Sequence, residues 1–196
     1  MVRCPASIFS ADYRASSMAE TEVLRVGIVT VSDRASTGTY RDASGPAIEE
    51  FLREVVTTSW RTLARLVPDG IDSVRDVLVE LADREKCDLI FTTGGTGPAP
   101  RDLTPEATQA ACTRLMPGFG ELMRSESLKQ VPTAILSRQT AGIRGKTLIV
   151  NLPGRPSSIR FTLQAVFPAI PYCLDLIGAA RIDTDATKCK AFRPPP

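Results

Sequence analysis

The stretch LIFTTGGTGPAPRDLTPEAT, residues 89–108, begins with the pattern of an apolar strand and ends with that of a helix, which is typical of an α/β fold. Pro105 suits the first helical turn, where its missing N–H has no partner to lose, and Thr104 can cap the helix. Between the strand and the helix the loop is rich in glycine, at Gly94, Gly95 and Gly97. Glycine lets a ligand approach the backbone closely, so this loop is the first candidate for a binding site.

The segments on either side alternate between strand and helix patterns. Apolar or alternating segments predict strands at 24–32, 60–68, 87–93, 133–137 and 147–151. Apolar residues spaced by three or four predict helices at 45–56, 71–86, 103–115, 117–130 and 157–177. Strands that are apolar throughout and alternate with helices indicate a parallel sheet covered on both faces. We therefore expect an α/β fold, a single three-layer domain with a mostly parallel, helix-covered sheet.

The two ends of the chain lack these patterns. We expect the domain to occupy residues 23–180, with the segments 1–22 and 181–196 outside it. The apolar stretch near the N-terminus is too short for a secretory signal. A disordered tail is the preferred interpretation of residues 1–22, while an organelle-targeting segment and a working start at Met18 stay open.

Composition excludes several classes of protein. The 24 basic and 22 acidic residues give a net charge of +2 and are spread along the chain, so no nucleic-acid partner is expected. No apolar run approaches the roughly 18 residues of a membrane span, so no membrane partner is expected. The five cysteines include no CxxC pair, which argues against a disulfide framework and a zinc site. A reducing, cytoplasmic location fits best.

The chain contains no histidine, which excludes Ser–His hydrolysis and histidine-based zinc chemistry. The known phosphate-binding fingerprints also fail. No GxxxxGK[ST] motif is present, and a GxGxxG motif begun at Gly95 would need glycine where Pro100 stands. A P-loop and a nicotinamide cofactor are therefore disfavoured.

Two aspartates are candidates for the chemistry instead. Asp69 follows the second predicted strand and Asp102 follows the glycine loop, so both should lie at the carboxyl edge of the sheet, where α/β folds bind ligands. Each could also be a solvated loop residue, and Pro68–Asp69–Gly70 is a good turn sequence. Two carboxylates beside a loop whose N–H groups form an anion nest suit a magnesium–phosphate complex.

Several long motifs resemble one known family. They are GIVTVSDRAS (27–36), RLVPD (65–69), TTGGTGPAPRDLTPEAT (92–108), MPGFGELMR (116–124), VPTAILSRQTAGIRGKTLIVNLPGRPSSI (131–159) and AFRP (191–194). In this order they resemble the MogA-type molybdopterin adenylyltransferases of the MogA/MoaB family, which are similar to the G domains of gephyrin and the plant enzyme Cnx1. The resemblance runs from about Leu24 to Arg193.

The resemblance implies a fold, a reaction and partners. Members have a mostly parallel α/β fold, commonly form homotrimers, and use Mg-ATP to adenylylate the terminal phosphate of molybdopterin. The products are adenylylated molybdopterin and pyrophosphate, and molybdate is inserted afterwards. Magnesium, ATP and molybdopterin are thus the expected ligands, and the molybdate-insertion protein is a candidate partner. A MoaB-like binding protein or trimeric scaffold without significant turnover is the alternative.

The resemblance also implies site residues. Asp69 and Asp102 match the two essential aspartates, which we expect to hold magnesium. The expected substrate- and nucleotide-binding residues are Ser32, Asp33, Thr92, Gly94, Gly95, Thr96, Gly97, Ser137, Arg138, Pro153, Gly154 and Ser158. Three basic residues are candidates to neutralise the leaving pyrophosphate: Arg101, Arg138 and Lys146. Pro100 departs from the arginine that close bacterial relatives often carry.

Other conspicuous residues are expected to be structural. Phe51 and Trp60 should lie in the core, and Cys87 should be a buried, inert thiol. Four apolar residues of MPGFGELM should pack in the core or form a subunit contact: Met116, Phe119, Leu122 and Met123.

Overall fold

A six-stranded sheet forms the centre of the protein, whose computed structural model describes residues 23–195. The strand order is β2-β1-β3-β6-β5-β4. The strands are β1 (Leu24–Val31), β2 (Trp60–Val67), β3 (Leu89–Thr93), β4 (Arg114–Leu115), β5 (Ala141–Arg144) and β6 (Thr147–Leu152). The strands β2, β1, β3 and β6 are parallel, while β5 and β4 continue the sheet in antiparallel pairs.

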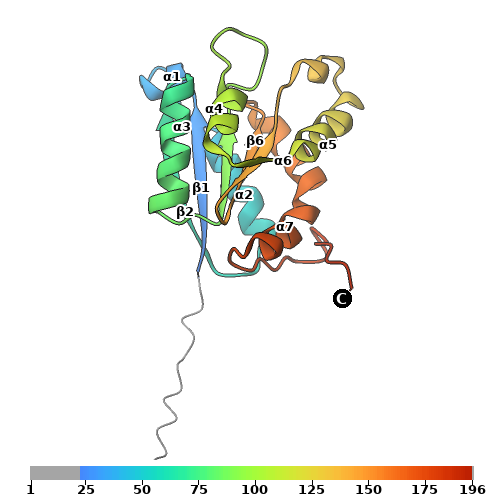
Figure 1. The fold of residues 1–196 in the computed structure, drawn as a ribbon. Helices are drawn as coiled ribbons and strands as arrows, with labels where there is room; N and C mark the ends of the chain where they lie inside the picture. The colour runs from blue at the N-terminus through green and yellow to red at the C-terminus, as the bar shows by residue number, and fades with distance from the viewer. Residues whose placement is uncertain (1–22, 196) are drawn as a thin grey trace, which may run out of the picture.

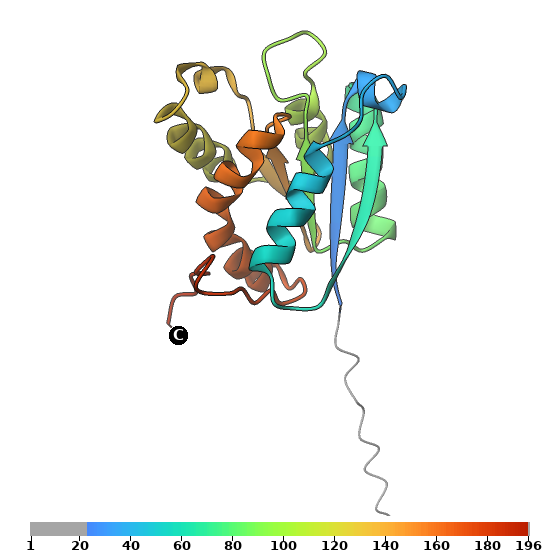
Figure 2. The same ribbon diagram turned by 180° about the vertical axis from the view of Figure 1, so that it is seen from behind.

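Helices cover both faces of this sheet. The α-helices are α1 (Asp33–Ser36), α2 (Ser44–Val55), α3 (Ile71–Val79), α4 (Thr104–Ala111), α5 (Pro117–Leu128), α6 (Pro156–Val166) and α7 (Ile170–Ile177). Shorter helical turns are η1 (Glu80–Arg84), η2 (Pro132–Leu136) and η3 (Phe167–Ala169). Helices α3 and α4 lie on one face (Figure 1), and α2 and α6 lie on the other (Figure 2). The expected three-layer α/β fold is confirmed.

The alternation of side chains along the strands divides the core between the two faces. Ile28, Phe91 and Val150 pack on the side of α2 and α6. Val29 and Ile90 pack on the side of α3 and α4. Because β1, β3 and β6 are buried on both faces, their sequences are apolar almost throughout, which is why the sequence predicts them well.

The strand expected at 133–137 is wrong. Residues 133–136 belong to the 3-10 turn η2, Ser137 follows this turn, and the neighbouring strand β5 begins at Ala141. Pro132 fixes the backbone at the start of η2, while β5 has only four residues, one of them glycine, and gives a weak pattern. The two-residue strand β4 has no pattern at all.

The helix expected at 157–177 is interrupted. Pro168 lies in η3 and Pro171 in the first turn of α7, so the segment divides into α6, η3 and α7. Proline provides no N–H for the preceding helical turn, which explains the break. The helix expected at 71–86 likewise ends as the π-turn η1.

The C-terminal residues lie against the domain. Ile182 is fully buried, and the N–H of Asp185 donates to the carbonyl of Val55 at 2.9 Å. The N–H of Phe192 donates to the carbonyl of Pro168 at 3.0 Å. Our division of the chain at residue 180 stays a prediction, and the predicted tail 1–22 lies outside the described residues. No helix within residues 23–195 is long and apolar enough to cross a membrane.

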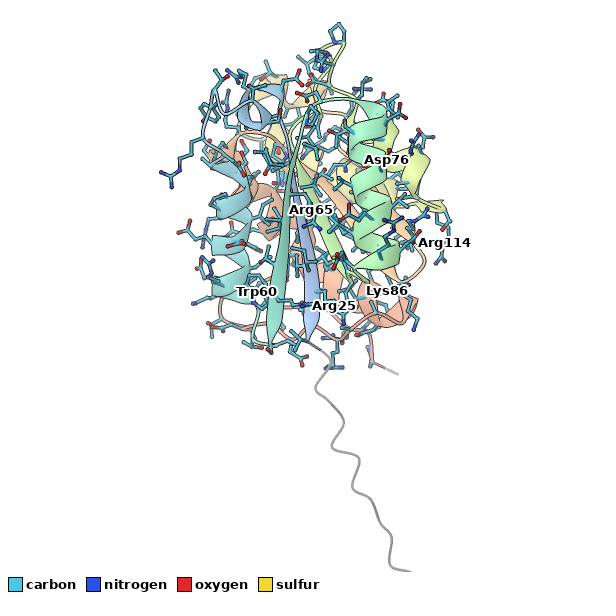
Figure 3. The ribbon with its side chains drawn as sticks, turned by 90° about the vertical axis from the view of Figure 1, so that its left-hand side faces the viewer. Arg25, Trp60, Arg65, Asp76, Lys86 and Arg114 are labelled. Carbon is cyan, nitrogen blue, oxygen red and sulfur yellow. The ribbon has the colours of Figure 1, made fainter. Side chains whose placement is uncertain are left out.

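The structure places most of the expected structural residues inside. Phe51 and Met123 are fully buried, and Trp60 packs against the core from the end of β2 that lies away from α1 (Figure 3). Met116 and Phe119 also pack against the core, whereas Leu122 is exposed. Burial raises the pKa of the Cys87 thiol to about 12, as expected of an inert core cysteine.

Replacing Phe91 tests the core of the central strand. The ring is fully buried, so Phe91→Ala should lower the free energy of unfolding by about 3–5 kcal/mol. Urea denaturation measures this change. Leu176→Ala is the control, because this leucine is 68% exposed and its loss should change the free energy of unfolding by no more than about 0.5 kcal/mol. Equal effects of the two substitutions would contradict the assigned core.

Candidate active site

A cavity of about 600 Å³ lies at the carboxyl ends of the parallel strands. Half of the expected site residues line it: Ser32, Asp33, Asp69, Gly94, Gly95, Asp102 and Gly154. The loop that follows β3 projects from this end of the sheet, next to α1 (Figure 1). The structure thus brings Asp69 and Asp102 to one cavity, as their positions after strands predict. We refer to this space as the first cavity.

A second cavity, of about 630 Å³, lies beside the first. It is lined by most of the other expected residues: Thr96, Gly97, Ser137, Pro153 and Ser158. Gly154 and Arg155 line both cavities, so the two spaces are contiguous. The second cavity also carries apolar side chains, including Val131, Leu136 and Phe161. It can therefore take a less polar group than the first.

Two glycines of the loop after β3 have backbone angles that exclude other residues. Gly94 has φ of 102°, and a Cβ atom there would lie 2.2 Å from the carbonyl oxygen of Val31. Gly95 has φ of 62°, and its Cβ would lie 2.3 Å from Oγ1 of Thr104. Positive φ and these contacts both require glycine. The loop therefore lies tightly against the end of β1 and the start of α4.

Thr104 does not cap the helix as expected. It is the first residue of α4, the capping position belongs to Leu103, and no side chain caps that end. The Thr104 hydroxyl instead donates to the carbonyl of Gly94 at 2.8 Å, and its N–H donates to the carbonyl of Gly95 at 3.0 Å. Thr104 thus ties the glycine loop to the helix.

Three N–H groups of this loop have no partner among the described residues. Within residues 23–195, the N–H groups of Gly95, Thr96 and Gly97 donate no hydrogen bond. Successive free N–H groups next to residues with positive φ form an anion-binding nest. A phosphate group is a suitable ligand for such a nest.

Asp33 and Asp69 exchange two hydrogen bonds, because the backbone N–H of each donates to the carboxylate of the other. The N–H of Asp33 donates to Oδ2 of Asp69 at 2.9 Å, and the N–H of Asp69 donates to Oδ1 of Asp33 at 3.1 Å. Arg101 lies across both residues. Its Nε is 2.7 Å from Oδ2 of Asp33, and its Nη2 donates to Oδ1 of Asp33 at 3.0 Å and to the carbonyl of Asp69 at 3.2 Å.

This arrangement changes the acidity of Asp33. The hydrogen bond from Arg101 holds the pKa of the Asp33 carboxyl below its ordinary value of 3.8, with help from the Asp69 N–H and against a smaller effect of burial. Asp33 is therefore a carboxylate at neutral pH, and its oxygens are already engaged by protein donors.

Asp102 is held by its own loop and by Arg138. Its Oδ2 accepts the N–H of Ala99 at 3.0 Å. The guanidinium of Arg138 donates to the carbonyl of Gly97 at 2.9 Å, and also to the carbonyl of Asp102 and the carboxylate of Glu106. Burial raises the pKa of Glu106, but Arg138 outweighs this effect and the pKa lies below its ordinary value. Arg138 thus braces the loop and lines neither cavity.

Besides Arg138, two expected residues line neither of these cavities. Thr92 is fully buried inside the sheet and accepts a hydrogen bond from Nδ2 of Asn151 at 3.0 Å. Its neighbour Thr93 lines the first cavity, because successive strand residues point to opposite faces. Lys146 shares a different cavity with Arg25 and Lys86, at the opposite end of the sheet from α1 (Figure 3). The expectation that Lys146 faces the pyrophosphate is wrong.

Several further residues line the first cavity although no motif of the sequence singles them out: Thr30, Asp42, Ser44, Thr93 and Arg155. Oδ1 of Asp42 accepts the N–H groups of Ser44 and Gly45, at 2.8 and 3.2 Å, and Oδ2 accepts the Thr30 hydroxyl at 2.7 Å. Asp42 thus satisfies the first N–H groups of α2. An aspartate two residues before a helix, and a threonine within an apolar strand, were the signals that could have identified these positions.

The aspartates fit a magnesium ion that also binds substrate phosphate. Within residues 23–195, no group of three or more His, Cys, Asp or Glu side chains could hold a metal ion. Oδ1 of Asp69 and Oδ1 of Asp102 accept no hydrogen bond in that same range. A Cβ on Gly95 would lie 3.3 Å from Oδ1 of Asp69, so this oxygen faces the glycine loop. One or two carboxylates plus phosphate oxygens are the usual magnesium ligands.

Comparison with known proteins identifies the family. Residues 27–172 match the family described as a probable molybdopterin binding domain. The chain belongs to this family. A molybdopterin adenylyltransferase of Helicobacter pylori (strain ATCC 700392 / 26695) is 53% identical over 173 residues, which are 88% of this chain and 98% of that protein.

Other members of the molybdopterin binding family are nearly as similar. A molybdopterin adenylyltransferase of Escherichia coli (strain K12) is 48% identical over 183 residues, covering 87% of this chain and 94% of that protein. The solved structure of the molybdopterin biosynthesis enzyme MoaB from Thermus thermophilus is 48% identical and superposes with a TM-score of 0.73. It covers 79% of this chain and 96% of that one.

Substituting Gly95 tests the close contact between the glycine loop and Thr104. Gly95→Ala should destabilise the protein and weaken ATP binding, because the new methyl group would meet Thr104 and fill space beside Asp69. Gly145→Ala is the matched control, since Gly145 has φ of 57° and nothing within 4 Å of the added Cβ. Gly145→Ala should lower the free energy of unfolding only by the cost of a positive φ in alanine, about 1–2 kcal/mol. Urea denaturation and calorimetric ATP titration measure both effects, and equal losses would contradict the assigned contact.

Removing Arg101 tests the electrostatics of Asp33. Arg101→Gln should raise the pKa of Asp33 toward its ordinary value, because the charged donor is lost. A lowered pKa in the folded state gives stability that is present above the unfolded pKa and is lost as the pH falls through the folded value. In Arg101→Gln, protonation of Asp33 should therefore lower the free energy of unfolding by less than it does in the native protein. Carboxyl-carbon NMR titration gives the pKa directly, and an unchanged value would contradict the ion pair.

Proposed function

We propose that this chain is a molybdopterin adenylyltransferase of molybdenum cofactor biosynthesis. It would transfer the adenylyl group of ATP to the terminal phosphate of molybdopterin and release pyrophosphate. The observation that carries the proposal is the pair Asp69 and Asp102 in one cavity, next to a loop with free N–H groups. Relatives of this name match nearly their whole length at 53% and 48% identity, which supports it.

The chemistry needs positioning and charge more than a protein nucleophile. The attacking group would be the phosphate of molybdopterin, so the lack of histidine is no obstacle. In phosphoryl-type transfers, proteins act chiefly by placing the reactants in line and stabilising charge. A bound magnesium ion would neutralise the charge on the ATP phosphates. Asp69 and Asp102 would hold that ion, and the N–H groups of Gly95 to Gly97 would bind phosphate oxygens.

The two contiguous cavities support a two-substrate reaction. The first contains the aspartates and suits the triphosphate of ATP. The second shares Gly154 and Arg155 with it, and its mix of hydroxyl and apolar side chains suits a ring system. Ser137, Pro153 and Ser158 would contribute to binding there, as the resemblance implies. Thr92, being buried in the sheet, would act only through its contact with Asn151.

Further properties of the family belong to the same proposal. Magnesium, a homotrimer, a cytoplasmic location and the molybdate-insertion protein as partner are carried over from the family resemblance. Exposed apolar side chains near α5 and η2 support a subunit contact: Leu122, Leu128, Val131, Ile135 and Leu136. Leu136 and Val131 also line the second cavity, so a neighbouring subunit would narrow it.

The alternative is a protein that binds molybdopterin without significant turnover. The relatives named molybdopterin adenylyltransferase favour the enzyme over this alternative. Both functions predict molybdopterin binding. They differ in whether ATP is cleaved.

Replacing each aspartate tests the proposal. Purified protein with molybdopterin and Mg-ATP should release pyrophosphate, while Asp69→Asn and Asp102→Asn should each lower kcat by about 10²–10³-fold, because the metal loses a charged ligand. Asp72→Asn is the control, since this exposed aspartate pairs with Arg75 on α3 and should keep full activity.

Two outcomes would contradict the proposal. Molybdopterin binding by the native protein without pyrophosphate release would favour the binding or scaffold function. Full activity of either aspartate variant would remove that residue from the chemistry, provided that thermal unfolding shows the variant to be folded.

A further inference from the structure

The two aspartates of the site lie on separate parts of the sheet edge. Asp69 follows β2, and Asp102 follows the glycine loop after β3. Strand β1 lies between β2 and β3, so the ladder does not pair the two segments directly. A metal ion held by both carboxylates needs a fixed separation between them. Some contact outside the sheet must set this separation.

A single side chain connects the two aspartates. Arg101 is the immediate neighbour of Asp102, and it reaches Asp33 through Nε and Nη2 at 2.7 and 3.0 Å. The same Nη2 donates to the carbonyl of Asp69 at 3.2 Å. Asp33 in turn exchanges two hydrogen bonds with Asp69, at 2.9 and 3.1 Å. The contacts therefore run without a gap from Asp102 through Arg101 and Asp33 to Asp69.

We propose that Arg101 is a positioning residue, which acts through Asp33 to set the separation of Asp69 and Asp102 and so to order the metal–ATP site. In this role, Arg101 does not neutralise the charge of the leaving pyrophosphate. This inference rests on the proposed function, because it assigns Asp33 and Arg101 their roles within that reaction. Asp33 then holds Asp69 in place and is not itself a ligand of the substrate.

Both the chemistry and the exposure of the pair support this role. The planar guanidinium donates to both oxygens of Asp33 and to a carbonyl in one geometry, which the single ammonium group of lysine cannot reproduce. The Arg101 side chain is 67% exposed, and exposed ion pairs add little to global stability. The pair should therefore matter to the local site more than to folding.

Direct contact between Arg101 and phosphate is the competing role. Arg101 lines the first cavity and could leave Asp33 when ATP binds. The two roles predict different responses to the loss of Asp33. If Arg101 acts through Asp33, removing both residues costs no more than removing one, whereas two independent functions would give additive losses.

The test measures metal binding together with kinetics. Mn²⁺ binding in the presence of ATP is followed by electron paramagnetic resonance for Arg101→Lys, Asp33→Asn and the double variant. Each single variant should weaken Mn²⁺ binding about tenfold, as expected when a residue that orients a metal ligand is lost. The double variant should match the single ones. The Mg²⁺ concentration for half-maximal activity should rise in parallel, with molybdopterin binding unchanged.

Arg160→Lys is the matched control. Arg160 makes a similar two-pronged contact with the carboxylate of Glu54, at 2.5 and 2.8 Å, and lines neither cavity. Its replacement should leave Mn²⁺ binding and activity unchanged. Thermal unfolding of all variants should agree within a few degrees, which separates positioning from a general loss of structure.

Three results would overturn the inference. The first is native Mn²⁺ affinity in Arg101→Lys with a raised KM for ATP or a lowered kcat, which would assign Arg101 to the phosphates. The second is additive loss in the double variant. The third is no Mn²⁺ binding by the native protein with ATP. If native protein binds Mn²⁺ and ATP but forms no product, the proposed function fails while the variants still test the positioning role.

Discussion

The close approach of three backbone segments at the carboxyl edge of the sheet is the constraint on which the site depends. A Cβ on Gly94 would lie 2.2 Å from the carbonyl of Val31, and a Cβ on Gly154 would lie 3.1 Å from Cα of Gly94. The ends of β1, β3 and β6 can meet in this way only because no side chain separates them. The parallel register of these strands brings the three segments to the same edge. The glycine loop and the two cavities lie at this edge.

The charged residues around this backbone have two different roles. The arginines fix the position of the loop, whereas the two aspartates keep oxygens free of protein donors. Arg138 is occupied by carbonyls of its own loop and by Glu106, and Arg101 is occupied by Asp33. Both arginines therefore brace the loop that carries Asp102. Among the carboxylates that line the first cavity, the oxygens that no donor of the described residues engages belong to Asp69 and Asp102. In the proposed function, these two oxygens would be the protein's ligands to magnesium, and no histidine would be needed.

The sequence predicts the features that rest on local patterns. The apolar runs of β1, β3 and β6, the loop glycines and the aspartates after two strands are all readable, because burial and backbone angles restrict the residue type directly. The incorrect predictions arise where tertiary contacts determine the secondary structure or the direction of a side chain. The strand β5 is short and is defined by its pairing with β6, and Thr92 differs from Thr93 only in the face to which it points. The contact of Arg101 with Asp33 joins segments 68 positions apart, and no spacing reveals it.

A crystal structure of the protein with Mg²⁺ and a non-hydrolysable ATP analogue would show directly which residues hold the metal. We predict a magnesium ion held by Asp69 and Asp102 together with phosphate oxygens, with other phosphate oxygens on the N–H groups of Gly95 to Gly97. Arg101 should still contact Asp33 in that complex. A metal bound elsewhere, or Arg101 turned away from Asp33 onto the phosphates, would contradict the account.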